Sequence, residues 1–135
     1  MHDFENSGPI GLRGEAGEEV PDDLPDDSAL AYVCGEGVVV ITGCSHAGIC
    51  NIVEQAKRVT GVDRIHDIIG GFHLLEPSER QLEGTVEYLA GLELPRLSAC
   101  HCTDFHSRLR LAQVAPLREI GSGLQIRYCE DGERA

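Results

Sequence analysis

Three histidines of this sequence each stand just after a short β-prone segment, where the chain turns. They are His46, His73 and His101, and glycines lie beside the first two. Imidazole is the commonest protein ligand for metal ions and binds zinc, iron and manganese to differing degrees. In open α/β sheets, ligands bind outside the carboxyl ends of the strands. We therefore expect the three imidazoles to gather along one sheet edge, close enough to share a divalent metal site. The alternative for each is a solvent-facing residue or one whose hydrogen bonds are made in the core.

Cysteines accompany two of these histidines, in Cys44-Ser45-His46 and Cys100-His101-Cys102. An even number of cysteines is typical of disulfide frameworks in short secreted chains. The first residues lack a basic region followed by an apolar stretch, so we expect a cytoplasmic protein with reduced thiols. Metal ligation is then the sharper hypothesis for Cys44. Cys100 and Cys102 would share one face of a strand and leave His101 on the other, so we expect both to be structural.

The remaining histidines and cysteines have simpler interpretations. His66 lies inside a β-prone run and should point away from the edge, whereas His106 starts a helix at the surface. A closed zinc module built from Cys44, His46, Cys100 and Cys102 is disfavoured, because its two clusters are 54 residues apart and match no zinc-ribbon spacing. Three cysteines have no ligand partner nearby and are expected to be small packing residues: Cys34, Cys50 and Cys129.

Strands and helices alternate over most of the chain. Two β-prone runs, 29–33 and 38–42, flank Cys34–Gly37, which is a hairpin signal. Apolar residues then recur at helical spacing up to Gly61, and Ser78 with Gln81 predicts a capping box for a second helix. The expected strands are 29–33, 38–42, 65–69, 97–100 and 124–128, and the expected helices begin near residues 49, 78 and 107. The order β-β-α-β-α-β-α-β predicts an α/β fold with helices covering a sheet.

Charge is concentrated at the start of the chain. The formal net charge is -12, and residues 1–28 hold nine acids and one base. We predict an acidic extended loop over 1–28 and a folded body over 29–135. A chain this acidic is a poor partner for nucleic acid backbones. No run of about 18 apolar residues is present, so the sequence predicts no membrane span.

Three spaced motifs resemble one branch of the metallo-β-lactamase superfamily. They are Gly43-Cys44-Ser45-His46-Ala47-Gly48, Gly70-Gly71-Phe72-His73-Leu74 and Cys100-His101-Cys102-Thr103. The branch is often labelled 7,8-dihydropterin-6-methyl-4-(β-D-ribofuranosyl)aminobenzene 5′-phosphate synthase. The resemblance implies an αββα sandwich with one or two metal ions at the edge of its sheets. The family's His-x-His-x-Asp-His motif is missing here, so the sequence resembles the C-terminal half of the family's domain.

The resemblance also implies roles for particular residues. His101 matches the family's last metal-binding histidine. Cys44 stands where many relatives have a bridging aspartate, so either Cys44 or the neighbouring His46 is the second ligand, and we favour His46. His73 is expected to act as a general acid or to contact the substrate. Asp104 stands where the family pattern has glycine, which puts the local turn in doubt.

The expected function is metal-dependent hydrolysis of a phosphoester or carboxyl ester of a small molecule. Zinc is the expected ion, with manganese or iron as alternatives. The N-terminal ligands are absent, so we expect no turnover from this chain without its missing N-terminal half or a homo-oligomeric partner. The alternative function is that of a non-catalytic half-domain. Its signature would be an exposed apolar face on the sheet.

Overall fold

A single four-stranded sheet organises the body of the protein. The computed structural model describes residues 1–5 and 8–128. The strands are β3 (Ala29–Cys34), β4 (Gly37–Thr42), β5 (Ile65–Gly71) and β6 (Ser98–Cys100). They lie in the order β3-β4-β5-β6, with β3 antiparallel to β4 and the other pairs parallel. The predicted hairpin and the predicted α/β class are both confirmed.

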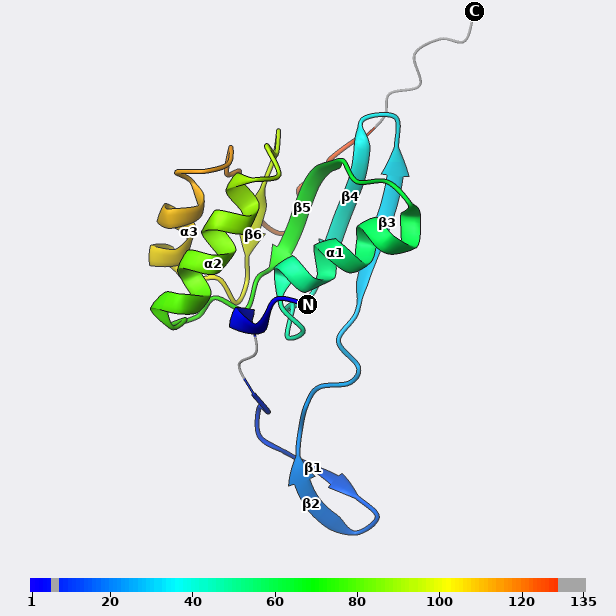
Figure 1. Ribbon diagram of the computed structural model, residues 1–135, viewed down its shortest axis with the longest axis vertical. Helices are drawn as coiled ribbons and strands as arrows, with labels where there is room; N and C mark the ends of the chain where they lie inside the picture. The colour runs from blue at the N-terminus through cyan, green and yellow to red at the C-terminus, as the bar shows by residue number, and fades with distance from the viewer. Residues whose placement is uncertain (6–7, 129–135) are drawn as a thin grey trace, which may run out of the picture.

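Two long helices cover one face of this sheet. They are α1 (Ile49–Thr60) and α2 (Glu79–Ala90), and the shorter α3 (Phe105–Leu111) lies beside α2 (Figure 1). Helix α1 connects β4 to β5, α2 connects β5 to β6, and α3 follows β6. The parallel strands β4, β5 and β6 therefore end at the same edge of the sheet. Among the described residues, no helix is long and apolar enough to cross a membrane.

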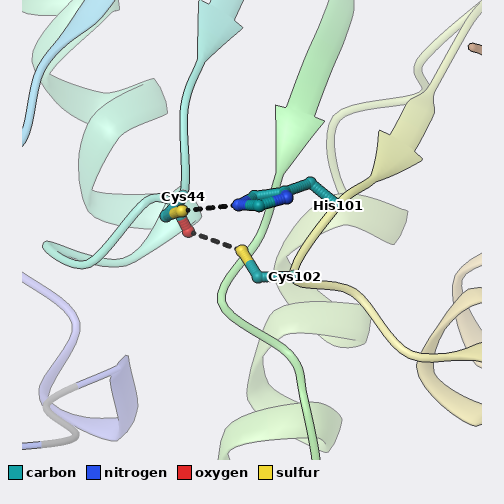
Figure 2. Close-up of side chains that lie close together, drawn as sticks. All are labelled: Cys44, His101 and Cys102. Atoms are coloured by element: carbon teal, nitrogen blue, oxygen red, sulfur yellow. Dashed lines mark hydrogen bonds between the residues drawn. The ribbon is translucent and has the colours of Figure 1, made fainter.

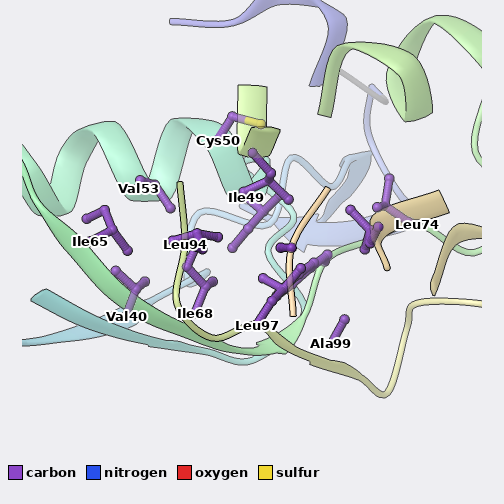
Figure 3. Close-up of a cluster of buried hydrophobic side chains, with 14 of the residues drawn as sticks. Val40, Ile49, Cys50, Val53, Ile65, Ile68, Leu74, Leu94, Leu97 and Ala99 are labelled. Atoms are coloured by element: carbon purple, nitrogen blue, oxygen red, sulfur yellow. The ribbon is translucent and has the colours of Figure 1, made fainter. Parts of the chain in front are cut away.

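The core lies between the sheet and these helices (Figure 3). Val40 and Ile68 point from the strands toward Ile49 and Val53 of α1, and all four side chains are buried. Burying a side chain of this size stabilises a fold by about 1.5–3 kcal/mol. This layer therefore holds the strand ends in fixed positions relative to one another.

The ends of the helices follow the sequence signals in most respects. Gly61 ends α1 in the left-handed conformation, with φ of 70°. The Ser78 hydroxyl accepts a hydrogen bond from the Gln81 backbone N–H at 3.2 Å. The capping box is only half formed, because the Gln81 side chain donates instead to the backbone oxygen of His73. The α2 cap is thus tied to the loop that carries His73.

Residues 1–28 contain more structure than the extended loop that we expected. A short hairpin, β1 (Leu12–Glu15) with β2 (Glu18–Pro21), projects away from the body (Figure 1). Its two turn residues, Ala16 and Gly17, have φ of 52° and 91°. Positive φ at both positions is the geometry of the tight turns that favour hairpins. An Ala-Gly pair predicts such a turn only weakly. The composition of residues 1–28 therefore indicated a loop instead of a hairpin.

The predicted final strand at 124–128 is wrong. These residues form no ladder in the described part of the chain, and the isolated bridge nearest to β6 joins Leu97 to Leu117. A β-prone run without a neighbouring strand gains no ladder hydrogen bonds. Tyr128 instead donates a 2.6 Å hydrogen bond to the carboxylate of Asp67 on β5. Burial raises the pKa of that carboxyl group. The prediction for Cys129 lies outside the described residues.

The N-terminal end of α1 is capped by a residue far away in the sequence. The N-cap position is Gly48, which has no side chain to accept a hydrogen bond. The buried carboxylate of Glu5, in a 3-10 turn over Asp3–Glu5, accepts from the backbone N–H groups of Cys50 at 2.7 Å and Asn51 at 2.8 Å. A negative charge at this position also complements the helix dipole. The first residues of the chain therefore stabilise α1.

Replacing Glu5 with glutamine should destabilise the fold. An amide has one accepting oxygen, so one of the two N–H groups would face the amide nitrogen without a partner. We expect the free energy of unfolding to fall by about 1–3 kcal/mol. Urea denaturation followed by circular dichroism measures it. Asp3→Asn is the matched control, since Asp3 pairs with Arg80 at the surface and should contribute little. Equal losses in both variants would rule out the capping role.

Candidate metal centre

The ends of β4, β5 and β6 turn sharply, and each turn contains a non-glycine residue with positive φ. These residues are Ser45 at 61°, His73 at 52° and His101 at 52°. Side chains disfavour this conformation, and it is concentrated at functional sites in proteins. The Ser45 hydroxyl donates to the Gly71 backbone oxygen at 2.6 Å, and Leu74 N–H donates to the Cys102 oxygen at 2.9 Å. The three turns are therefore joined to one another at a single edge.

Cys44, His101 and Cys102 converge at this edge (Figure 2). The Cys44 sulfur lies 3.0 Å from Nε2 of His101, and the Cys102 thiol donates to the Cys44 backbone oxygen at 3.3 Å. The two sulfur atoms and one imidazole nitrogen all lie within 4.8 Å of one another. His101 is exposed, and both cysteines are partly buried. This group is open to solvent on one side and held by the turns on the other.

The structure differs from our expectation for Cys102. We placed it on the strand face opposite His101, but β6 ends at Cys100 and the alternation ends with it. The positive φ of His101 redirects the backbone, so that two consecutive side chains face Cys44. A Cβ at Gly71 would lie 2.6 Å from the Cys102 sulfur, so glycine is needed there. The only signal for Cys102 in the sequence was its position next to His101.

His46 and His73 form a second group beside the first. Their rings meet edge to face, with centroids 5.0 Å apart. Nδ1 of His46 lies 3.6 Å from a carboxylate oxygen of Asp27, whose other oxygen accepts the Ala47 N–H at 2.9 Å. Asp27 was not distinguishable from the other acids of its segment in the sequence. Of the two candidate second ligands, the structure brings Cys44 to His101 and turns His46 toward Asp27 and His73.

Burial shifts the pKa values of two side chains at this edge, His73 and Cys102. It lowers the pKa of His73, and the charge of His46 adds to the effect while Asp27 opposes it. At pH 7, the neutral fraction of His73 is therefore larger than that of an ordinary histidine. This favours a substrate contact by His73 at neutral pH and proton donation by His73 at acidic pH. Burial also raises the pKa of the Cys102 thiol, partly offset by the His73 backbone N–H that donates to its sulfur at 3.3 Å.

Asp104 resolves the doubt about the turn after His101. Its carboxylate caps α3 by accepting the Ser107 N–H at 2.7 Å, and its other oxygen accepts the Glu76 N–H at 2.8 Å. Asp104 is therefore the N-cap of this helix. Asp104, which replaces the glycine of the family pattern, therefore holds the turn in place instead of disrupting it.

The donor chemistry at this edge fits a metal ion. Two thiols and an imidazole are the donors that zinc prefers, whereas magnesium and calcium prefer oxygen. Among the described residues, the cluster of Cys44, His101 and Cys102 is the one group of at least three potential ligands whose donor atoms lie this close together. The residues present are therefore compatible with a divalent metal.

Known structures and proteins agree with this geometry. No family model matches the chain. The crystal structure of a metal-dependent hydrolase of the β-lactamase superfamily matches with a TM-score of 0.81 and 30% sequence identity, over 95% of this chain and 51% of that one. With the fold and the histidine-cysteine edge already described, this likeness defines the class. The chain belongs to the metallo-β-lactamase superfamily.

Two curated relatives come from Methanocaldococcus jannaschii. The chain is 34% identical over 103 residues to 7,8-dihydropterin-6-methyl-4-(β-D-ribofuranosyl)-aminobenzene-5′-phosphate synthase, covering 76% of this chain and 35% of the synthase. It is 35% identical over 98 residues to an uncharacterized protein, covering 73% of this chain and 35% of that protein. The branch resemblance in the sequence is thereby confirmed. The chain spans about a third of the length of these relatives.

Proposed function

We propose that this chain carries part of the active site of a metal-dependent hydrolase that acts on a phosphoester or carboxyl ester of a small molecule. The observation that carries the proposal is the contact between Cys44 and His101 at the shared edge of three strand ends, with His73 beside it. The structural neighbour is a metal-dependent hydrolase, which supports the reaction class. The synthase relative shows that the same branch includes other chemistry.

Cys44 and His101 would hold the ion, and His46 is the alternative to Cys44. Zinc is the ion that best suits a thiolate with an imidazole, ahead of iron or manganese. When bound, such an ion would supply Lewis acidity and lower the pKa of a water molecule to about 7. Reduced thiols are needed for this role, which fits a cytoplasmic location.

The second group of residues would handle the substrate. His73 lies at the turn after β5, where its backbone N–H donates to the Cys102 sulfur. Its side chain would donate a proton to the leaving group or contact the substrate. Asp27 would position His46, whose ring packs against that of His73. The two groups together provide metal ligands on one side and a polar substrate contact on the other.

Turnover is proposed to need residues that this sequence does not contain. No His-x-His-x-Asp-His motif occurs in it. Hydrolysis of a panel of chromogenic phosphoesters and carboxyl esters, with zinc and with manganese, tests the proposal. The chain is assayed alone and after mixing with the segment of the crystallised neighbour that lies outside the matched 51%. Metal-dependent hydrolysis in the mixture supports the proposal, and its absence with metal bound favours a non-catalytic half-domain.

One observation favours that second candidate. On the sheet face opposite the helices, Leu30, Tyr32 and Ile41 are 69%, 50% and 40% exposed. Leu30 pairs with Ile41 across β3 and β4, so the three side chains form a continuous apolar surface. Contiguous exposed apolar surface marks an interaction site or a tendency to associate. The complementary part of a superfamily domain is the proposed occupant of this face.

Removing that apolar surface should keep the chain monomeric. We expect the wild-type chain to associate as its concentration rises, because burying Leu30 and Ile41 removes apolar area from water. The double variant Leu30→Lys/Ile41→Lys should sediment as a monomer over the same range. Val59→Lys is the matched control, since Val59 is 71% exposed on α1, away from this face. A wild-type chain that stays monomeric at high concentration would contradict the proposal.

A further inference from the structure

Cys102 is a candidate ligand that neither the family pattern nor the sequence spacing predicted. Its sulfur faces the same point as the Cys44 sulfur and Nε2 of His101, although the chain reaches that point from two strand ends 58 residues apart (Figure 2). The Cys102 sulfur lies within hydrogen-bonding distance of two backbone groups, the Cys44 oxygen and the His73 N–H, both at 3.3 Å. Cys100, two residues earlier, is not part of this group. The side chain is therefore held in place from both sides.

The spacing of the three donor atoms suits one small ion. Zinc lies about 2.3 Å from thiolate sulfur and about 2.0–2.1 Å from imidazole nitrogen, which puts tetrahedral ligand pairs about 3.6–3.8 Å apart. The three atoms here are all within 4.8 Å of one another, and the Cys44 sulfur is 3.0 Å from Nε2 of His101. Shifts of about 1 Å or less would bring each pair to that spacing. A magnesium or calcium site would call for oxygen donors, and this group has none among its side chains.

The surroundings of the cluster also fit a ligand role. Metal ligands are usually oriented by hydrogen bonds from a surrounding shell. Here the His73 N–H donates to the Cys102 sulfur, and it would continue to do so when that sulfur is a thiolate. The positive φ of His101 is an uncommon backbone conformation whose effect is to point two consecutive side chains at Cys44.

We propose that Cys102 is the third protein ligand of a Cys2His site, so that Cys44, His101 and Cys102 bind one zinc ion within this chain. Three protein ligands leave a fourth position open, which is the arrangement of a catalytic zinc. The inference rests on the proposed function, since both place a metal at this edge. It goes beyond the proposed function, because the site needs no donor from another chain.

Metal binding by the purified chain tests this assignment. The chain is titrated with zinc against a chromogenic chelator, and cobalt is used as a spectroscopic probe for sulfur ligands. We expect one ion per chain. Cys102→Ser should weaken zinc binding by at least about 100-fold, more than the 10–100-fold typical of residues outside the ligand shell. The cobalt–sulfur absorption band should lose about half its intensity in Cys102→Ser and likewise in Cys44→Ser.

Cys100→Ser is the matched control, because Cys100 is two residues away and outside the cluster. It should bind zinc as the wild type does. Alkylation followed by peptide mapping provides a readout that tolerates partial unfolding of a variant, since zinc should protect Cys44 and Cys102 of the wild type but leave Cys34 reactive. Two results together would overturn the inference and leave a metal on Cys44 and His101 intact: wild-type affinity in Cys102→Ser, and alkylation of Cys102 in the wild-type chain at full zinc occupancy. A wild-type chain that binds no zinc would overturn it too, whereas the hydrolysis assay of the mixture would still decide the proposed function.

Discussion

His101→Ala should remove both the metal and the turnover of the hydrolase reconstituted with this chain. Alanine has no lone pair to replace Nε2, which lies 3.0 Å from the Cys44 sulfur at the centre of the cluster. We expect metal affinity to fall by more than the 10–100-fold that follows loss of an outer-shell partner, with metal-dependent hydrolysis falling at least as far. Metal content by mass spectrometry and the rate on the ester panel are measured on the same samples.

His106→Ala provides the control for that substitution. His106 is exposed on α3, five residues further along, and is not part of the cluster. It should keep full metal content and full rate. If His101→Ala also kept both, the metal centre described above would be wrong.

His73→Ala should separate the reaction from metal binding. The side chain is not part of the donor cluster, so the variant should retain the metal. If His73 donates a proton to the leaving group, the rate should fall by about 10²–10⁴-fold, the usual contribution of a positioned acid or base. Circular dichroism and metal analysis verify that fold and metal are unchanged, and steady-state rates give the loss.

The leaving group of the substrate distinguishes the two possible roles of His73. A proton donor matters little when the leaving group is a stable anion, so the loss should shrink on p-nitrophenyl esters and grow on alkyl esters. A residue that only contacts the substrate should cause the same loss on both. A full rate on every substrate would exclude both roles.

The sequence predicted the sheet and its edge well because those features depend on local patterns. Apolar spacing located α1 and α2, and strand-end position was enough to place His46, His73 and His101 at one edge. The failures were non-local or depended on backbone conformation. The role of Cys102 depends on the φ of His101, and Asp27 reaches His46 only because the chain folds back on itself. The strand expected at 124–128 needed a neighbour that the sheet does not provide.

The turn that carries Cys44 is fixed by carboxylates on both of its sides. Asp27 accepts the N–H of Ala47, and Glu5 accepts those of Cys50 and Asn51. This turn is therefore preorganised, and an arriving ion need not order it. Ordering one residue costs roughly 1–2 kcal/mol of conformational entropy, so a loosened turn would bind metal less tightly with every ligand still in place. Selection on metal affinity would then act on two acids of the first 28 residues, neither of which touches the ion.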